Sequence, residues 1–568
     1  MLLHLYPFLV CFILVTRVAA QSHILLPGDL TQKILEHREV RTGMAAPWIG
    51  ALHTTESIDA VEYMLQTDSL GSFGTPVGSH RRQFFLSAWN DALRTADSTI
   101  ETLTTHKPLW RTLYRSPAFL YETDGADFSL RVNPILDLQV GWDAEEDRPV
   151  YVNQRGLQVR GSVDGRVFFF TEVTETQARF PDYLNRRIAR DLAVPGFGFY
   201  KTNRSDLFGV SDARDLLNAR GYVAFRLTTH IGLRLGTGRH FLGNGQRSLL
   251  LSDFSNNAPF LELNTRIGRI HYQNLWMELT AASNTSLPGD VALPRKYLAA
   301  HSLGIQINPA FELTLFEAVV FSRNNRFDLS YLNPVIFYRA VEQAAGSPDN
   351  VLLGLNVRAD AFQQVRVYGQ AVLDEFRIQE MILDNRGWWG NKFGWQFGAT
   401  WHDAFGREDL RLQAEYNTVR PYTYSHRDSS ARYTHYRQPL AHPLGANFRE
   451  FLAILHWQPL PRWQLKVHAA HMVIGEDEND LNWGNNPLLS SDTRVREYEN
   501  VTTQGARSRI LMAGAVITWE VFHNAFFELS FLSRHQQSDL PDYTRQTTML
   551  CSGFRMNVSR RNPLIQMF

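Results

Sequence analysis

The chain has 568 residues, with 57 basic and 57 acidic side chains, so its net charge is zero and neither nucleic-acid binding nor a disordered acidic tail is indicated. A mean hydropathy of −0.26, with no long apolar run after the N-terminus, excludes a polytopic helical membrane protein. The two cysteines, Cys11 and Cys551, cannot form a disulfide framework or a cysteine-based zinc site.

Residues 1–20 have the pattern of a secretory signal peptide. Leu2 to Val15 is almost wholly apolar, and Val18-Ala19-Ala20 places small residues before a cleavage site at Gln21. The first residues carry no Lys or Arg, so an N-terminal membrane anchor is the alternative, although the apolar run is short for one. The sequence predicts export from the cytoplasm.

Residues 21–124 contain two helical patterns within otherwise irregular sequence. Ser57 to Leu65 begins with a capping residue and continues with apolar positions at helical spacing. Arg82 to Leu103 repeats this spacing. We expect a partly helical region here, which is either a small domain or a loose extension of residues 125–568.

From about Asp124 the hydrophobic period changes to two. In Tyr222–Leu235 the odd positions are apolar, apart from Thr229, and the even positions include Arg226, His230 and Arg234. About seventeen segments of this kind occur, starting near Phe128, Leu157, Val167, Tyr222, Phe260, Ile270, His301, Phe311, Val351, Val365, Phe393, Leu410, Phe451, Trp463, Ile510, Phe526 and Thr548.

The length of these segments separates two all-β architectures. Strands of soluble sheets average about five or six residues, whereas strands that cross a bilayer at a tilt need about nine to eleven. Our segments have roughly nine to fourteen residues, which matches a transmembrane antiparallel β-barrel over residues 125–568. A secreted β-sandwich or propeller is the alternative.

Short and long connections alternate along this region. The short ones are 162–166, 308–310, 404–406 and 458–461, and the long ones are 176–218, 283–299, 324–350, 420–446 and 474–507. Outer-membrane barrels have this arrangement, with the long loops outside the cell. At about 25 residues per strand we expect 18 strands, with 16 as the alternative. The terminal Phe568 is also common in such barrels, although one aromatic residue is weak evidence.

Arginine strongly outnumbers lysine among the basic residues, of which only six are lysines. Arginine bridges carboxylates in fixed geometry better than lysine does. We therefore predict ion pairs that brace or close the lumen, although a GC-rich coding sequence would also raise the arginine content. The predicted lumen residues are Arg226, Arg234, Arg358, Arg366 and Glu415.

Four motifs in order carry a resemblance to a known family. They are Asp127–Pro134, Gly236–Gly245 with the residues up to Phe260, Phe327–Arg339, and Leu352–Phe376. Over residues 124–568 this order resembles the Wzi-like capsule-assembly family and, within it, the RemB-type gliding-motility proteins. The resemblance implies an eighteen-stranded outer-membrane barrel with a small periplasmic helical element. It also implies a role in holding capsular or other surface polysaccharide.

The glycine-rich Gly236–Gly245 is not a nucleotide-binding loop, because no helix is expected after it. A tight turn or a loop that enters the lumen is the better interpretation. Arg239 in this segment is a candidate contact for a sugar. Arg339 is another candidate, and its alternative partner is a neighbouring carboxylate.

Polysaccharide binding needs aromatic faces for sugar C–H groups and polar side chains for hydroxyls and carboxylates. The long loops supply aromatic candidates, each of which has packing within a loop or an interfacial girdle as its alternative role. These candidates are Trp388, Trp389, Tyr422, Tyr424, Tyr433, Tyr436 and Trp483.

No residue pattern nominates catalysis, a metal or a cofactor. The acidic run 476–480 lacks the spacing of a calcium loop and is better interpreted as solvated. No nucleophile elbow accompanies a defined base and acid. A barrel hydrolase is therefore disfavoured, and we expect no enzymatic activity.

Two functions therefore stay open. The first is a barrel in the bacterial outer membrane that binds or anchors surface polysaccharide and supports gliding motility. Its expected partners are this polysaccharide, membrane lipid and lipopolysaccharide, and proteins of an export or motility machinery, but no nucleic acid. The alternative is a porin or solute transporter, which requires an open lumen.

Overall fold

The computed structural model describes residues 23–558 except 26–28, 69–73, 97–112, 126, 206–209, 282–292, 347, 376, 378, 385 and 479. The expected signal peptide at residues 1–20 and the terminal Phe568 therefore lie outside the described residues. So do residues 97–103, the end of the helical pattern expected over Arg82–Leu103.

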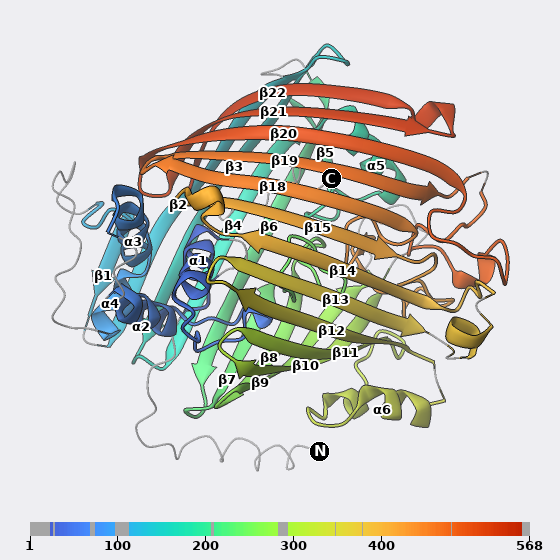
Figure 1. The fold of residues 1–568 in the computed structure, drawn as a ribbon, viewed down its shortest axis with the longest axis horizontal. Coiled ribbons are helices and arrows are strands. Elements are labelled where there is room, and N and C mark those ends of the chain that lie inside the picture. The colour runs from blue at the N-terminus through green and yellow to red at the C-terminus, as the bar shows by residue number, and fades with distance from the viewer. Residues whose placement is uncertain are drawn as a thin grey trace, which may run out of the picture.

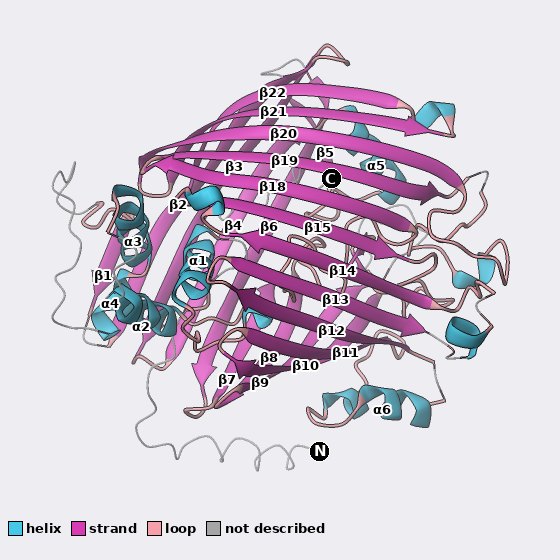
Figure 2. Cartoon of the chain, viewed as in Figure 1, coloured by secondary structure: helices cyan, strands magenta, loops and turns pink. Residues whose placement is uncertain are grey.

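Eighteen antiparallel strands form a closed barrel. Figures 1 and 2 show the sheet curving round with its strands side by side. Each strand pairs with its neighbour along the chain, and β2 pairs with β22 to close the sheet. This confirms the all-β fold and the expected count of 18. The strands are β2 (Phe128–Asp143), β3 (Arg148–Val163), β4 (Val167–Arg179), β6 (Val210–Arg226), β7 (Ile231–Gly238), β8 (Ala258–Ile267), β9 (Ile270–Thr280), β10 (Arg295–Asn308), β11 (Phe311–Phe321), β12 (Asn350–Ala361), β13 (Val365–Glu375), β14 (Lys392–Trp401), β15 (Leu410–Val419), β18 (Phe448–Leu460), β19 (Trp463–Glu476), β20 (Ala506–Phe522), β21 (Ala525–Ser538) and β22 (Arg545–Met556).

Four short strands lie outside this count. β1 (Tyr121–Asp124) pairs with the start of β2, and β5 (Lys201–Ser205) pairs with the start of β6. β16 (Thr434–His435) and β17 (Gln438–Pro439) form a separate two-stranded sheet within a long loop.

Side chains alternate between the two faces of the barrel wall. In β20, Leu511 is 58% exposed and its neighbour Met512 is fully buried, and the same alternation continues to Ile517 and Trp519. Outward apolar residues of this kind occur on most strands, whereas the inward ones pack against chain segments inside the lumen.

Our interpretation of Tyr222–Leu235 as one strand is wrong. Its first residues end β6, its last residues belong to β7, and residues 227–230 form the turn between them. The last pair of the ladder is Arg226 with Gly232, so an odd number of residues, five, lies between paired positions, and odd positions keep facing the same side across the hairpin. The alternation therefore continues through the turn and hides it. This is why the sequence showed seventeen segments rather than eighteen.

Short turns and long connections lie at opposite ends of the barrel. Seven connections of at least fourteen residues leave one end (residues 180–209, 239–257, 281–294, 322–349, 376–391, 420–447 and 477–505), and turns such as 164–166 and 309–310 close the other. Two helices lie in the long connections, α5 (Asp182–Asp191) and α6 (Tyr338–Ala344). We call the two ends the short-turn end and the long-loop end.

The N-terminal helices lie at the short-turn end, on the left in Figure 1. They are α1 (Leu30–Thr42), α2 (Ser57–Asp68), α3 (Pro76–Ala88) and α4 (Asn90–Ala96), which pack around a core that includes Met64, Phe85 and Leu93. We call residues 23–96 the cap. Among the described residues, no helix is long and apolar enough to cross a membrane.

The helix expected over Ser57–Leu65 is confirmed as α2. The pattern from Arg82 onward instead divides into α3 and α4, with a break at Trp89. No sequence pattern indicated α1, because its apolar residues do not gather on one face and much of its burial is polar, including Arg38 and Glu39.

Candidate functional site

The cap closes the lumen at the short-turn end through buried ion pairs. Glu39 of α1 accepts hydrogen bonds from Arg358 of β12 and Arg366 of β13, each at 2.8 Å. Arg358 is fully buried and also lies 3.4 Å from Glu312 of β11. Glu312 in turn accepts the backbone N–H groups of Gly50 and Ala51 at 3.1 Å. The barrel wall therefore binds the cap through buried charged groups that have no access to water.

Further ion pairs surround this contact. Arg226 of β6 donates to Glu56 at 2.7 Å, and Arg266 of β8 donates to Asp59 at 2.8 Å. Burial raises the pKa of the Glu56 carboxyl, and the two arginines Arg266 and Arg226 oppose that rise. Two of the predicted lumen arginines, Arg358 and Arg366, thus share one glutamate of α1, and Arg226 pairs with the segment before α2.

A second layer above the cap is formed by the connection 239–257 between β7 and β8, which we call the plug loop. Glu415 of β15 accepts the backbone N–H groups of Gln246 at 2.7 Å and Arg247 at 3.1 Å. A Cβ atom on Gly245 would lie 2.5 Å from a carboxylate oxygen of Glu415, so the glycine allows this close approach. The glycine-rich motif is a loop inside the lumen, one of the two interpretations that the sequence allowed.

The plug loop is also fixed by charge and by aromatic hydroxyls. Arg247 lies 3.4 Å from Glu450 of β18, which His442 contacts at 2.8 Å. Tyr424 donates its hydroxyl hydrogen to the carbonyl of Leu249, and Tyr433 donates to that of Leu250. Both tyrosines are fully buried. They hold the plug loop in place and do not face solvent.

Arg234 of β7 belongs to a third buried group. It pairs with Glu262 of β8, and His240 contacts the same carboxylate at 2.9 Å. His240 lies in the plug loop, and burial lowers the pKa of its imidazole although Glu262 acts in the opposite direction. All five predicted lumen residues therefore lie inside the barrel and contact the cap, the plug loop or a neighbouring strand.

The other candidate contacts are dispersed. Arg239 donates to the carbonyl of Gly196 and to Asn257, inside the barrel. Tyr436 packs edge-on against Phe199 at 5.1 Å. Arg339 lies on α6 and donates to Glu342 at 2.9 Å, the carboxylate alternative that the sequence left open. Arg239 and Tyr436 both lie beside residues 196–198, since a Cβ atom on Gly198 would lie 3.2 Å from Tyr436, whereas Arg339 lies apart from them on α6.

Four of the predicted aromatic residues do come together at the long-loop end. The ring centroids of Trp388 and Trp389 are 5.9 Å apart, and those of Trp389 and Tyr422 are 6.4 Å apart. Tyr422 donates its hydroxyl hydrogen to the carbonyl of Asn482 at 2.9 Å, next to Trp483. Three long loops, 376–391, 420–447 and 477–505, thus meet at one place.

Arginine side chains cover these aromatic rings. The guanidinium carbon of Arg494 lies 4.3 Å from the ring centroid of Trp389, that of Arg377 lies 4.4 Å from Trp388, and that of Arg496 lies 5.4 Å from Trp483. We call Arg377, Trp388, Trp389, Trp483, Arg494 and Arg496 the rim cluster. Guanidinium groups stacked on aromatic faces in this way are stabilised by cation–π attraction.

The polar groups of the rim cluster are incompletely paired. Arg494 contacts Glu497 and lies 3.9 Å from Asp492. Among the described residues, no carboxylate forms an ion pair with Arg377 or Arg496. The indole N–H of Trp483 and the Nε–H of Arg496 are buried, and no described residue accepts a hydrogen bond from either of them. The cluster therefore combines positive charge with the half-buried rings of Trp389 and Trp483, while Trp388 is buried beneath Arg377.

Sequence reasoning missed the three rim arginines. Arg494 and Arg496 lie in the predicted long connection 474–507, spaced two residues apart, and Arg377 follows the motif that ends at Phe376. Aromatic residues with arginines in neighbouring loops were a usable signal. The sequence did not show which of the aromatic residues each arginine covers.

The acidic run at 476–480 has a structural use. Asp477 accepts the backbone N–H of Trp483 at 2.6 Å and that of Gly484 at 3.1 Å. Burial nevertheless raises the pKa of this carboxyl, and the backbone donors oppose the shift. Asp477 therefore fixes the turn that presents Trp483 to the rim cluster.

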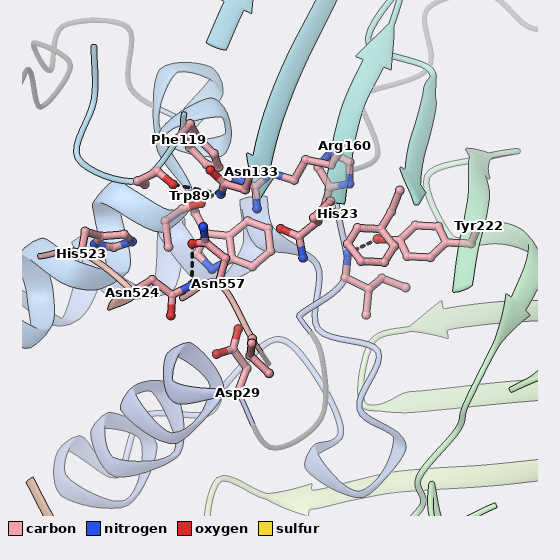
Figure 3. Close-up of a pocket in the computed structure, with 16 residues that line it drawn as sticks. His23, Asp29, Trp89, Phe119, Asn133, Arg160, Tyr222, His523, Asn524 and Asn557 are labelled. Carbon is pink, nitrogen blue, oxygen red and sulfur yellow. Dashed lines mark hydrogen bonds between the residues drawn. The ribbon is translucent and has the colours of Figure 1, made fainter. Parts of the chain in front are cut away.

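A separate cavity of about 80 Å³ lies at the short-turn end, between the cap and the barrel wall, as Figure 3 shows. Arg160 of β3 lies 4.3 Å from the ring centroid of Trp89 and donates to Asp91 of α4 at 2.9 Å. Burial, and then Arg160, lowers the pKa of His23 to about 3. A cavity of this size holds a few water molecules and lies at the opposite end from the rim cluster.

One group among the described residues has the spacing of a metal site, His37 with Asp403 and Asp409. Its carboxylates already have cationic partners, because Arg41 lies 2.9 Å from Asp403 and Arg81 contacts Asp409. The group joins α1 and α3 of the cap to the turn between β14 and β15. We interpret it as another attachment of the cap.

A scan against protein-family models found no match, and a search of curated proteins found no similar sequence. Among solved structures, Escherichia coli Wzi matches with a TM-score of 0.56 and 12% identity, over 96% of this chain and 100% of Wzi. Wzi is described as an outer membrane protein involved in group 1 capsule assembly and a carbohydrate-binding β-barrel. Pseudomonas aeruginosa OccK8 (OprE) and OccD3 (OpdP) match with TM-scores of 0.40 and 0.41 and identities of 9% and 12%, over 76% and 77% of this chain and 98% and 92% of theirs. The likeness to Wzi supports the barrel fold that the sequence motifs implied.

Proposed function

We propose that this protein is a non-enzymatic barrel of the bacterial outer membrane that binds an acidic surface polysaccharide at its long-loop end. The observation that carries this proposal is the rim cluster, in which arginines stack on loop tryptophans above a lumen filled by the cap and the plug loop. The shared fold with Wzi, a carbohydrate-binding barrel, agrees with it.

The outer wall supports the membrane location. Closed sheets are the β-structures that satisfy all backbone polar groups in hydrocarbon. Outward-facing side chains such as Leu511, Ile517, Leu529 and Phe531 are exposed and apolar. In this proposal residues 1–20 direct export, the cap lies in the periplasm, and the wall contacts membrane lipid and lipopolysaccharide.

The chemistry of the rim cluster supports an acidic glycan. Tryptophan faces pack against the C–H faces of sugar rings, while a guanidinium group donates two parallel hydrogen bonds to a carboxylate. Arg377 and Arg496 are suited to this role because no described carboxylate competes for them. Uronic acids carry both features in a single sugar residue.

Retention of polysaccharide by cells tests the proposal. Deleting the gene should move surface polysaccharide from the cell-attached to the shed fraction, and the intact gene supplied in trans should reverse this. A variant with Trp389→Ala and Arg496→Ala should behave like the deletion while still reaching the membrane. Unchanged retention in both strains would contradict the proposal.

The porin alternative requires a continuous aqueous path. The buried contacts of Glu39 in the cap with the barrel wall, and of Glu415 in the wall with the plug loop, disfavour such a path. Planar-bilayer recording of the purified protein separates the two functions. Large and steady conductance of the unmodified protein would favour the porin.

A role in gliding and contacts with export or motility machinery are finer parts of the same proposal, suggested by the RemB-type resemblance of the sequence motifs. Spreading of the deletion strain on agar tests them separately. If spreading is normal and polysaccharide is lost from the cells, only the motility role fails.

A further inference from the structure

One long connection folds back along the outside of the barrel. In the segment Phe327–Ala344, between β11 and β12, the carbonyl of Tyr331 accepts the indole N–H of Trp276 at 3.0 Å. The carbonyl of Pro334 accepts the hydroxyl of Tyr272 at 2.5 Å and the side-chain N–H of Asn274 at 2.9 Å. Figure 1 shows α6, the end of this segment, outside the sheet beside β11 and β12. We call Phe327–Ala344 the outer segment.

The alternation of the strands shows that the outer segment covers the outward face. On β10, Ala300 and Ser302 line a cavity with residues of the plug loop, so they face the lumen. Ala299 and His301 therefore face outward. The outer segment packs there, in a cluster that includes Trp276, Ala299 and Tyr331.

Beneath the outer segment lies a polar pair that is unusual for the outer wall of a barrel. His301 of β10 contacts Glu317 of β11 at 2.7 Å, and Glu317 is buried. Glu317 also accepts the backbone N–H groups of Tyr338 at 3.0 Å and Arg339 at 2.9 Å. The ring of Tyr338 stacks on His301 with 4.4 Å between centroids. The start of α6 thus shields the pair from the surroundings of the barrel.

Several polar backbone groups of the outer segment have local partners. Tyr331 donates its N–H to the carbonyl of Asp328, Val335 donates to the Asn333 side chain, and Ala340 donates to the carbonyl of Phe337. The barrel wall supplies acceptors and donors for Tyr331, Pro334, Tyr338 and Arg339. A segment satisfied in this way is compatible with surroundings that contain no water.

The surface that the outer segment turns away from the barrel is mostly apolar, although Ser330, Asn333 and Gln343 are also exposed. Leu329 is 75% exposed, Val335 is 78% exposed and Phe337 is 74% exposed, and Leu332 and Ile336 are also exposed. Outward-facing Leu315 and Leu353 on β11 and β12 continue this surface along the wall. The charge of Arg339 is compensated by Glu342 at 2.9 Å.

The depth of the contacts places this surface below the long-loop end. Glu317 lies four residues before the end of β11, and Asn274 lies six residues before the end of β9. At about 2.6 Å of depth per residue for a tilted strand, these positions are roughly 10–15 Å below the strand ends. An apolar band of about 25 Å includes that depth.

We propose that the outer segment lies within the membrane, with Leu329, Val335 and Phe337 among the acyl chains of the lipid, and that it seals His301 and Glu317 from that lipid. The inference rests on the proposed membrane location of the barrel. The sequence analysis placed this connection outside the cell. The inference instead places it in the outer half of the bilayer.

Spin labelling of the full-length protein in liposomes tests this. Cys11 and Cys551 are replaced by serine, and single cysteines are introduced as Val335→Cys and Phe337→Cys. Leu315→Cys, on the outer wall, is the lipid control, and Val501→Cys, exposed in the long loop 477–505, is the water control. Accessibility to oxygen and to a water-soluble nickel chelate is measured at each label. We expect the oxygen-to-nickel ratio at 335 and 337 to match that at 315 and to exceed that at 501 roughly tenfold, because polar solutes are excluded from hydrocarbon.

Each other outcome has a defined meaning. Labels at 335 and 337 that behave like 501, while 315 is in lipid, overturn the inference and leave the barrel in the membrane. A label at 315 that is also open to nickel overturns the proposed membrane location itself. Spectral broadening at 337 that disappears on dilution with unlabelled protein would show that a second copy covers the surface, which also overturns the inference.

A second variant tests the attachment. Glu317→Ala removes the acceptor of two backbone N–H groups, so nickel accessibility at a label on 337 should rise several-fold, while Glu317→Gln keeps one acceptor and should change it less. Glu278→Ala is the control, because Glu278 lies on β9 beside Arg295 and does not contact the outer segment. Equal accessibility in all three variants would contradict the role of Glu317 in holding the outer segment.

Discussion

The two ends of this barrel use the same residue type in different ways. At the short-turn end, Arg358 and Arg366 are buried against Glu39, and their charges hold the cap. At the long-loop end, Arg377 and Arg496 stack on tryptophans and lack a carboxylate partner among the described residues. A guanidinium already paired in a dry site stabilises structure, whereas one supported by an aromatic face keeps its donors for a ligand.

The largest expected effect concerns Glu39, which we expect to be needed for docking of the cap at the short-turn end. Glu39→Ala leaves Arg358 and Arg366 buried with fewer partners, so docking of the cap should lose about 3–5 kcal/mol. Glu36→Ala is the matched control, because Glu36 lies 3.9 Å from Arg411 in a more exposed pair and should contribute less than about 1 kcal/mol. Hydrogen exchange of residues 30–68 in liposomes measures both changes. Equal protection in the two variants would contradict this role of Glu39.

Acidification should weaken the same contact. His37 of α1 and His402 in the turn after β14 stack at 5.5 Å, and burial lowers the pKa of both below the usual 6.5. When the cap is undocked, the two histidines therefore bind more protons below that pH, so their contribution to docking is complete above about pH 6.5 and falls as the pH falls.

At pH 5.5 we expect docking to lose about 1–3 kcal/mol, since each histidine contributes at most about 1.4 kcal/mol per pH unit. Hydrogen exchange of α1 at matched intrinsic rates between pH 7.5 and 5.5 measures this. The variant His37→Gln should have a smaller pH dependence, and an unchanged slope would exclude His37 as the titrating group.

Substitutions at the rim cluster should affect binding and leave stability unchanged. Arg496→Ala should weaken binding of an acidic polysaccharide about tenfold, which corresponds to about 1.4 kcal/mol. Arg496→Lys should recover only part of this, because lysine keeps the charge but not the planar fork over Trp483. Isothermal titration with a uronate-containing glycan, together with thermal unfolding, measures the two effects. A loss of stability equal to the loss of binding would make Arg496 structural.

The smallest expected effect sharpens the comparison within the rim cluster. Glu497 contacts Arg494 and competes with a bound carboxylate. Glu497→Gln should therefore strengthen binding about twofold at low salt, and this gain should disappear at high salt because exposed charges are screened. Glu499→Gln, two residues away, is the control. A gain that persists at high salt would indicate another cause.

The architecture was predictable because it depends on short-range regularities. Alternation, segment length and connection length each depend on neighbouring residues, and together they indicated an eighteen-stranded barrel with long loops at one end. The same rule failed at Tyr222–Leu235, where an odd number of residues between the last paired positions preserves the alternation through a hairpin. The alternation of apolar residues alone cannot distinguish one long strand from two strands joined by such a turn.

The site was less predictable because it depends on contacts between distant segments. The inward arginines were visible, but their partners Glu39 and Glu56 lie in the N-terminal region and carry no pattern that links them to β12 or β6. Tyr422 and Tyr424 are two residues apart, yet Tyr422 packs against Trp389 of the rim cluster and Tyr424 holds the plug loop. The sequence identified aromatic residues in the loops, but it did not show which of them lie near the rim cluster and which hold the plug loop.

The most direct test of the proposed ligand surface is equilibrium binding of an acidic polysaccharide to the purified barrel. We expect binding that weakens as salt is raised, that falls at least about tenfold in the Trp389→Ala, Arg496→Ala variant, and that is unchanged in Trp463→Ala, a tryptophan on the outer wall near the short-turn end. No binding by the unmodified barrel, or equal binding by all three proteins, would contradict the claim that the long-loop end is the ligand surface.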